Sequence, residues 1–180
     1  MTVAATVAGA PVTIAEVDAR EAAVRSRAPR HALPRPGTRE GRQLRRWLTQ
    51  VIVAERVLAR EAGGLDSDDP PPTEDDLLPD TLARLELGSI AAATLAAPAA
   101  RAVFAHVTAD VVVDDAAVAD YHARNPERMP ESEVAAHLRA SARRRAYRRW
   151  LGARCAEVVV LSPGYEHPGD PRQPDNTHTH

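Results

Sequence analysis

An apolar stripe with helical period, running from residue 44 to residue 62, constrains the fold of this chain most strongly. Its members are Leu44, Trp47, Leu48, Val51, Ile52, Leu58 and Ala62. Residues three and four apart lie on one face of an α-helix, so this spacing predicts a long helix with one buried side. Thr38 is a suitable cap for its start, and Gly63-Gly64 marks its end.

Capping residues and prolines predict further helices on both sides of this one. They are expected at 14–28, with a Thr13–Glu16 capping box; at 80–87; at 89–107, with a kink at Pro98; from Asp114 or Asp115 to Arg124; and from Pro130 through Trp150. Residues 65–80 are acidic and rich in proline but lack the order of an EF-hand loop. A solvated loop is therefore expected there rather than a calcium site.

Extended segments are expected at 3–8, 111–113 and 157–161, with a turn over Gly9, Ala10 and Pro11. The first and last of these segments are expected to pair. The predicted fold class is mostly α: a single helical domain over residues 1–161, with a small two-strand pairing of the N- and C-terminal segments. An irregular, proline-rich C-terminal tail is expected over residues 162–180.

Composition excludes several classes of protein. The 180 residues carry a net charge of −2 and one cysteine, Cys155, which excludes an internal disulfide and a multi-cysteine zinc site. Near-neutral charge and 3% aromatic residues argue against nucleic acid as a partner. The sequence has no nucleotide-cofactor motif, neither a Walker A loop nor GxGxxG. No secretion signal or membrane span is visible, so no membrane partner and a cytoplasmic location are expected.

Two segments resemble a known family. Residues 7–14, Val-Ala-Gly-Ala-Pro-Val-Thr-Ile, resemble the V-N-G-x-x-I-T opening of SurA N-terminal-like domains, which occur in periplasmic chaperones and parvulin-type prolyl isomerases. Residues 111–126, from Val111 to Pro126, are similar to a later segment of that family that ends in Asn-Pro. The resemblance implies a mostly helical scaffold whose first strand pairs with a late strand. It also implies a groove for unfolded peptide or another apolar ligand.

The resemblance carries over the scaffold and not the isomerase activity, since the chain has no room for a rotamase domain. Ala136-His137-Leu138 is similar to the start of that domain but continues into an arginine-rich helix. Residues 164–171 resemble the ends of small actinobacterial proteins, some of them found near natural-product genes. That likeness suggests a role in biosynthesis as a tailoring enzyme.

The C-terminal tail holds a candidate metal site. His178 and His180 alternate in extended chain, so both imidazoles lie on one side. His167 or Asp175 would supply a third ligand. Nitrogen and oxygen ligands suit a divalent transition metal, namely Zn²⁺, Cu²⁺, Ni²⁺ or Fe²⁺.

Two other interpretations of the tail stay open. In one, it is a mobile, polar chain end. In the other, it covers the groove of the scaffold, anchored by Tyr165, with Glu166 and Asp170 among its ligand-binding residues. Histidine and aspartate there would act on a ligand as acid and base, without metal.

A helix rich in arginine follows Pro130. Its members are Arg139, Arg143, Arg144, Arg145, Arg148, Arg149 and Arg154. They spread around the helix, which favours a solvated or salt-bridged helix with the acidic loop as partner over a phosphate-binding face. Core positions are expected for Trp47, Trp150 and Tyr121, a surface position for His122, and a buried, inert thiol for Cys155.

The sequence thus predicts a small ligand-binding protein on a SurA-like scaffold with a histidine-rich metal site. A peptide-binding, chaperone-like module is the first alternative. A protein that docks acidic partners through the arginine-rich helix is the second. The expected partners are a small apolar molecule or a peptide, and a homo-oligomer is compatible with the sequence.

Overall fold

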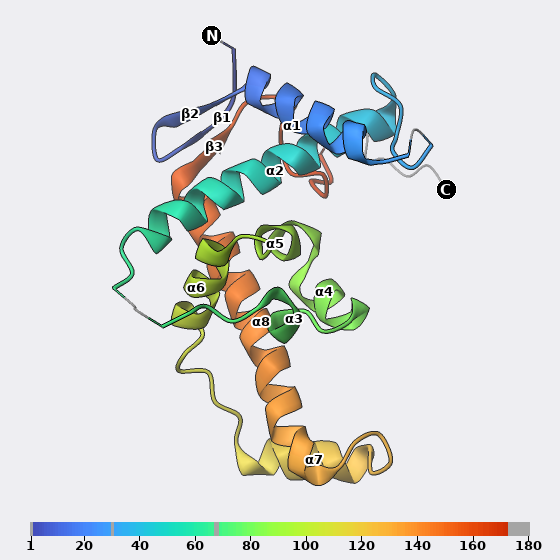
Figure 1. Cartoon of the computed structure of the whole chain (residues 1–180), viewed down its shortest axis with the longest axis vertical. Helices are drawn as coiled ribbons and strands as arrows, with labels where there is room; N and C mark the ends of the chain where they lie inside the picture. Colours follow the sequence, from blue (N-terminus) through green and yellow to red (C-terminus); the bar gives the residue numbers. More distant parts are fainter. Residues whose placement is uncertain (1, 30, 67–68, 173–180) are drawn as a thin grey trace. The chain divides into compact units, whose positions relative to one another are not determined.

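The computed structural model describes residues 2–29, 31–66 and 69–172. Helices dominate, as the sequence predicts, and a small antiparallel sheet accompanies them (Figure 1). The chain divides into two compact units, one of residues 1–57 and 154–180 and one of residues 58–153. The domain boundary expected at residues 161/162 stays a prediction.

The first unit begins with a β-hairpin of β1 (Val3–Val7) and β2 (Ala10–Thr13). Ala8 and Gly9 join the strands with φ of 47° and 83°, and positive φ at both central residues is what a type I′ hairpin turn requires. The turn therefore lies one residue earlier than predicted, and Ala10 and Pro11 belong to a strand. Pro11 is tolerated because β2 is an edge strand.

The third strand, β3 (Val159–Leu161), pairs antiparallel with β1, and Thr6 lies opposite Val160. The strand order is β2-β1-β3. The predicted pairing of the first and last extended segments is confirmed. The sheet also contains β2, a third strand that the sequence does not predict, because Gly9 and Pro11 favour a turn.

Two helices complete the first unit. The predicted capping box starts α1 (Ile14–Arg27), since Thr13 Oγ1 accepts from the Glu16 amide at 3.2 Å and Glu16 accepts from the Thr13 amide at 2.7 Å. Helix α2 (Arg39–Ala62) is the predicted long helix, and its residues 58–62 belong to the second unit. Its buried apolar residues are Leu48, Val51, Ile52, Val53, Ala54, Val57 and Leu58.

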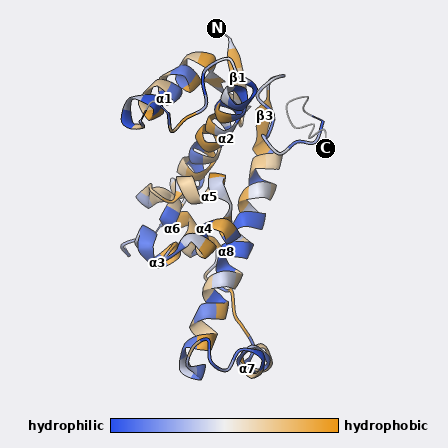
Figure 2. Ribbon diagram, turned by 90° about the vertical axis from the view of Figure 1, so that its right-hand side faces the viewer, coloured by the Kyte–Doolittle hydropathy of each residue, from blue (hydrophilic) through white to orange (hydrophobic). Residues whose placement is uncertain are grey.

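Besides the end of α2, the second unit contains six helices or parts of helices among its described residues. They are α3 (Glu74–Leu77), α4 (Thr81–Leu87), α5 (Ser89–Thr94), α6 (Pro98–Val107), α7 (Asp115–Arg124) and most of α8 (Glu131–Val158). Phe104 and Tyr147 pack at 4.9 Å between ring centroids, and both are buried. Hydrophilic and hydrophobic residues follow one another along α8 (Figure 2). This helix therefore contributes both core and polar groups.

Four local expectations are wrong in this unit and at its edge. A capping box between Thr73 and Asp76 forms α3 inside the expected acidic loop. Pro98 begins a separate helix instead of kinking one, as suits a residue that lacks an amide hydrogen. Residues 111–113 form no strand, and α8 continues to Val158, so the last strand is shorter than expected.

Gly88 ends α4 and begins α5 with φ of 88°, a conformation that favours glycine. The resulting sharp bend follows Glu86, whose side chain matters below. Among the described residues, no helix combines the length and the apolar character needed to cross a bilayer.

Candidate ligand pocket

A pocket of about 460 Å³, partly open to solvent, lies in the second unit between α4, α7 and α8. Its wall includes Leu82, Ala83 and Glu86 from α4, Tyr121 from α7, and His137, Leu138, Ser141, Arg144 and Arg145 from α8. The α8 residues recur at three- and four-residue spacing, which places them on one face of that helix. The pocket therefore combines apolar surface with a cluster of charged and hydroxyl side chains.

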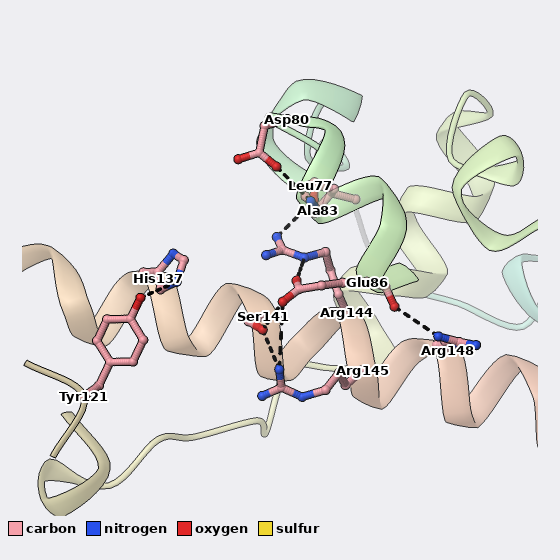
Figure 3. Close-up of polar contacts among 10 residues, drawn as sticks. All are labelled: Leu77, Asp80, Ala83, Glu86, Tyr121, His137, Ser141, Arg144, Arg145 and Arg148. Atoms are coloured by element: carbon pink, nitrogen blue, oxygen red, sulfur yellow. Dashed lines mark hydrogen bonds and ion pairs between the residues drawn. The ribbon is translucent and has the colours of Figure 1, made fainter. Parts of the chain in front are cut away.

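Glu86 is the centre of the charged cluster (Figure 3). Ser141 Oγ donates to its Oε1 at 2.6 Å, and Arg144 Nε donates to its Oε2 at 2.7 Å. Arg144 also donates from Nη1 to the Leu77 carbonyl at 3.3 Å and is only 6% exposed. Both carboxylate oxygens of Glu86 and the guanidinium of Arg144 are thus held by protein groups.

This environment fixes the charge state of Glu86. Burial by itself would raise the pKa of the carboxyl, but the hydrogen bonds from Ser141 and Arg144 and the charges of Arg144 and Arg145 outweigh it. The net result is a pKa below the usual range. Glu86 is therefore an ionised and rigidly held carboxylate.

Arg145 differs from its neighbour Arg144. Its Nη1 donates to Ser141 Oγ at 2.5 Å and lies 4.0 Å from Glu86 Oε1. Its side chain is 55% exposed, so it is the solvent-facing cation of the cluster. Ser141 links the two, because its hydroxyl donates to Glu86 and accepts from Arg145.

Tyr121 and His137 meet at another part of the pocket wall. The Tyr121 hydroxyl lies 3.4 Å from His137 Nε2, and the ring centroids are 5.6 Å apart (Figure 3). Tyr121 is half-buried, not in the core as predicted, and His122 is half-buried rather than at the surface. The Tyr121 side of α7 faces α8, as its contact with His137 shows.

The arginine-rich helix is salt-bridged as expected, but with an unexpected partner. Arg144 and Arg145 pair with Glu86 of α4 rather than with a carboxylate of the acidic segment, and Arg154 pairs with Glu157 of the same helix. Two further arginines bind oxygens of the segment that follows α6: Arg139 donates to the carbonyls of Val111 and Ala109, and Arg143 donates to Thr108 Oγ1 at 2.8 Å. These side chains hold the segment between α6 and α7 to α8.

The predicted tail residues Tyr165, Glu166 and Asp170 lie in the first unit. The Tyr165 carbonyl accepts from Gln50 Nε2 at 3.2 Å, which anchors the segment to α2. Glu166 accepts from the Gly164 amide at 2.9 Å. Hydrogen bonds from the guanidinium and the backbone amide of Arg172 lower the pKa of Asp170 to about 2. The two carboxylates therefore serve local turns of this segment.

Of the predicted metal ligands, only His167 belongs to the described residues; Asp175, His178 and His180 lie outside them. His167 Nδ1 accepts from the Gly169 amide at 2.9 Å. In the neutral ring the proton then lies on Nε2, so coordination through Nε2 requires this hydrogen bond to break. In the part of the chain that the structure describes, no three His, Cys, Asp or Glu side chains group as metal ligands.

Two expectations about packing are corrected here. Trp47 and Trp150 are only partly buried, and Tyr147 instead forms the aromatic core with Phe104. Cys155 is half-buried, and burial raises the pKa of its thiol, as expected for an inert cysteine.

Sequence reasoning missed the cluster around Glu86. Arg144 and Arg145 were noted only as members of a charged helix, and Ser141 and Glu86 carried no signal of their own. The hydrogen bond between Ser141 and Glu86 joins residues 55 positions apart. A local pattern cannot reveal such a pairing, although the one-face spacing of His137, Ser141 and Arg145 could have indicated a polar surface.

Comparison with known proteins matches the N-terminal part of the chain to a family model. Residues 3–40 match the model of a family of unknown function (DUF7158). This segment covers β1, β2, α1 and the start of α2, and the pocket lies outside it. No curated protein and no solved structure matches the chain. The function is therefore inferred from the pocket itself.

Proposed function

We propose that this protein binds a small amphipathic molecule in the pocket between α4, α7 and α8. The observation that carries the proposal is the pocket of about 460 Å³, within the 300–1,000 Å³ range typical of small-molecule sites. Such sites are largely apolar, with a few fixed polar groups that orient the ligand. Leu82, Ala83 and Leu138 supply the apolar surface here, and the Glu86 cluster supplies the fixed polar groups.

The floor of the pocket is organised before any ligand arrives. Glu86 and Arg144 already satisfy each other, and Arg144 is further held by the Leu77 carbonyl. A ligand therefore need not neutralise a buried charge, and little ordering of side chains accompanies binding. The polar groups toward the opening are Arg145 and the Tyr121–His137 pair.

The SurA-like scaffold remains part of this proposal. The pairing of β1 with β3, with helices between them in the chain, supports it. A peptide ligand is the second candidate, favoured by Leu82 and Leu85 of α4, which are 50% and 69% exposed. Suppression of the aggregation of heated citrate synthase, lost in Leu82→Asp/Leu85→Asp, would support this candidate.

A matched pair of variants tests the pocket. Ala140 lines it, and Ala140→Trp fills it, whereas Ala135→Trp places the same ring on an exposed position of α8 outside the lining. The probe is 4-phenylbutan-1-ol, a neutral molecule with a short apolar body, titrated into ¹⁵N-labelled full-length protein. We expect shifts of the Leu82 and Leu138 amide signals in wild type and Ala135→Trp but not in Ala140→Trp.

Equal shifts in all three proteins would contradict small-molecule binding at this site. So would the absence of shifts in wild type with 4-phenylbutan-1-ol and with the acid and the amine that have the same apolar body. Circular dichroism melting of both tryptophan variants controls for loss of the fold.

A further inference from the structure

We propose that the ligand of this pocket is a monoanion, specifically a carboxylate on an apolar body. This inference rests on the proposed function. It names the class of ligand that the charges in the pocket wall select.

The side chains that line the pocket include more positive than negative charges. The charged side chains are Asp80, Glu86, Arg128, Arg144 and Arg145, which gives three positive and two negative charges and a surplus of one positive charge (3 − 2). Each negatively charged side chain already makes at least one hydrogen bond within the protein. Glu86 binds Arg144 and Ser141, and Asp80 Oδ1 accepts from the Ala83 amide at 2.8 Å at the start of α4, where a helix dipole favours a carboxylate.

A cationic ligand would find no free acceptor in this cluster. Both oxygens of Glu86 accept from α8 side chains. A ligand that took the Oε2 hydrogen bond for itself would leave Arg144, which is 6% exposed, without its counter-ion. Leaving a buried cation unpaired is strongly unfavourable. The Glu86 cluster therefore disfavours amines.

Arg145 is the side chain positioned to receive an anion. Only its Nη1 is engaged, with Ser141 and at 4.0 Å from Glu86, and among the described residues nothing bonds to its Nε or Nη2. Nε and Nη2 form the edge that binds a carboxylate with two parallel hydrogen bonds. Arg128, exposed on the same wall, makes no side-chain hydrogen bond or ion pair within the described part of the chain and adds a second positive charge.

One surplus charge matches one negative charge on the ligand. A carboxylate at Arg145 would balance the pocket, while a phosphate monoester would bring close to two negative charges. The apolar body would lie against Leu82 and Leu138. The structure thus points to an aryl- or alkyl-carboxylic acid rather than a phosphate, an alcohol or an amine.

The experiment compares four molecules with one apolar body: 4-phenylbutanoic acid, 4-phenylbutan-1-ol, 4-phenylbutan-1-amine and 4-phenylbutyl phosphate. Dissociation constants are measured by NMR titration of the full-length protein at pH 7. We expect the acid to bind about tenfold more tightly than the alcohol, as one charge-assisted hydrogen-bonded pair would give. The amine should bind more weakly than the alcohol.

Arginine variants locate the effect. Arg145→Gln should weaken binding of the acid about tenfold and leave binding of the alcohol unchanged, and Arg128→Gln should have a smaller effect of the same kind. Arg149→Gln is the matched control, because Arg149 is exposed on the same helix but outside the pocket lining. It should leave the affinity for the acid unchanged.

The results separate the two proposals. If the alcohol binds in the pocket, is blocked by Ala140→Trp and equals the acid in affinity, small-molecule binding stands and the carboxylate inference fails. Tighter binding of the phosphate or the amine than of the acid, or an acid affinity unchanged in the Arg128→Gln/Arg145→Gln double variant, also overturns it. Binding of none of the four molecules overturns both proposals.

Discussion

Glu86 and Arg144 form the ion pair on which the floor of the pocket depends, and the two residues differ in exposure. The side chain of Arg144 is 7% exposed and that of Glu86 24%. If either residue is replaced by a neutral one, the other keeps a charge that is poorly solvated and has no counter-ion. The pair therefore fixes how α4 packs on α8 at the pocket, through residues that local sequence patterns did not single out.

Glu86→Gln should lower the free energy of unfolding by about 3 kcal/mol, because it leaves the guanidinium of Arg144 without its counter-ion. Urea unfolding at pH 7 measures this. A control replaces both members: Glu86→Met/Arg144→Met should recover most of the loss, since an apolar pair often substitutes for a buried ion pair at little cost. A double variant less stable than Glu86→Gln would contradict this account.

The lowered pKa of Glu86 predicts a pH dependence. Its ordinary value is near 4.5, and a carboxyl whose pKa is depressed in the folded state contributes stability above that value and loses it as the pH falls through the folded pKa. Wild type should therefore lose stability between about pH 5 and pH 3, with a shallower slope in Glu86→Gln. Urea midpoints across this range test it, and parallel slopes for the two proteins would contradict the assignment to Glu86.

The metal site expected at the C-terminus makes a separate prediction about single residues. Full-length protein incubated with Zn²⁺ and dialysed should retain one equivalent, and His178→Ala/His180→Ala should retain none, because two of the expected ligands are removed. Elemental analysis measures the content. His31→Ala is the control, as this exposed histidine lies far along the sequence from the tail. Equal zinc content in wild type and the double variant would exclude the site.

At the level of helices and strands, capping residues determine where elements begin. The Thr13–Glu16 pair starts α1, and the equivalent Thr73–Asp76 pair starts α3 although the helix has only four residues. Thr73 lowers the pKa of Asp76, as its hydrogen bonds favour the carboxylate form. The same local chemistry thus works in a long helix and in a short one.

Thr13→Ala should destabilise the protein by about 1 kcal/mol, because the Glu16 amide loses its side-chain acceptor. Ser26→Ala is a matched control near the other end of α1, where the hydroxyl only donates to the Ala23 carbonyl at an exposed position. Its effect should lie within about 0.5 kcal/mol. Urea unfolding of both variants provides the comparison, and equal effects would argue against the capping box as a source of stability.

Elements with a local signal were predictable, and long-range pairings were mostly not. The start of α1, the stripe of α2 and the Asp114 cap of α7 were all visible in the sequence. The turn at Ala8-Gly9 was misplaced because alanine at a positive φ has no sequence signature. Glu86 could not be assigned to the pocket, since its partners lie 55 and 58 residues away.

At the scale of the whole molecule, the chain holds two compact units with their own buried residues. Ala4, Ala5 and Val12 are fully buried in the first, and Phe104 and Tyr147 are buried in the second. The polypeptide passes between the units twice, within α2 and within α8. Each unit thus has a core that can be perturbed on its own.

Ala5→Leu should destabilise the protein by roughly 1–3 kcal/mol by overpacking the sheet, because Ala5 is 0% exposed. We expect faster amide hydrogen exchange in β1, β3 and α1, and a smaller change in α6 around Phe104. Hydrogen exchange of full-length protein by NMR measures both. Ala136→Leu is a suitable control, because Ala136 is exposed on α8. Ala8→Leu is not, because Ala8 has a positive φ. Equal acceleration throughout would show that the two units unfold as one.

The pairing of Thr6 with Val160 has a consequence for biosynthesis on the ribosome. The two residues are 154 positions apart (160 − 6). At a translation rate of roughly 5–20 residues per second, β3 is therefore synthesised about 8–30 seconds after β1. During that time the hairpin of β1 and β2 presents an unsatisfied edge to solvent and to neighbouring nascent chains. Rare codons in the second half of the message would lengthen this interval, during which β1 has no β3 to pair with.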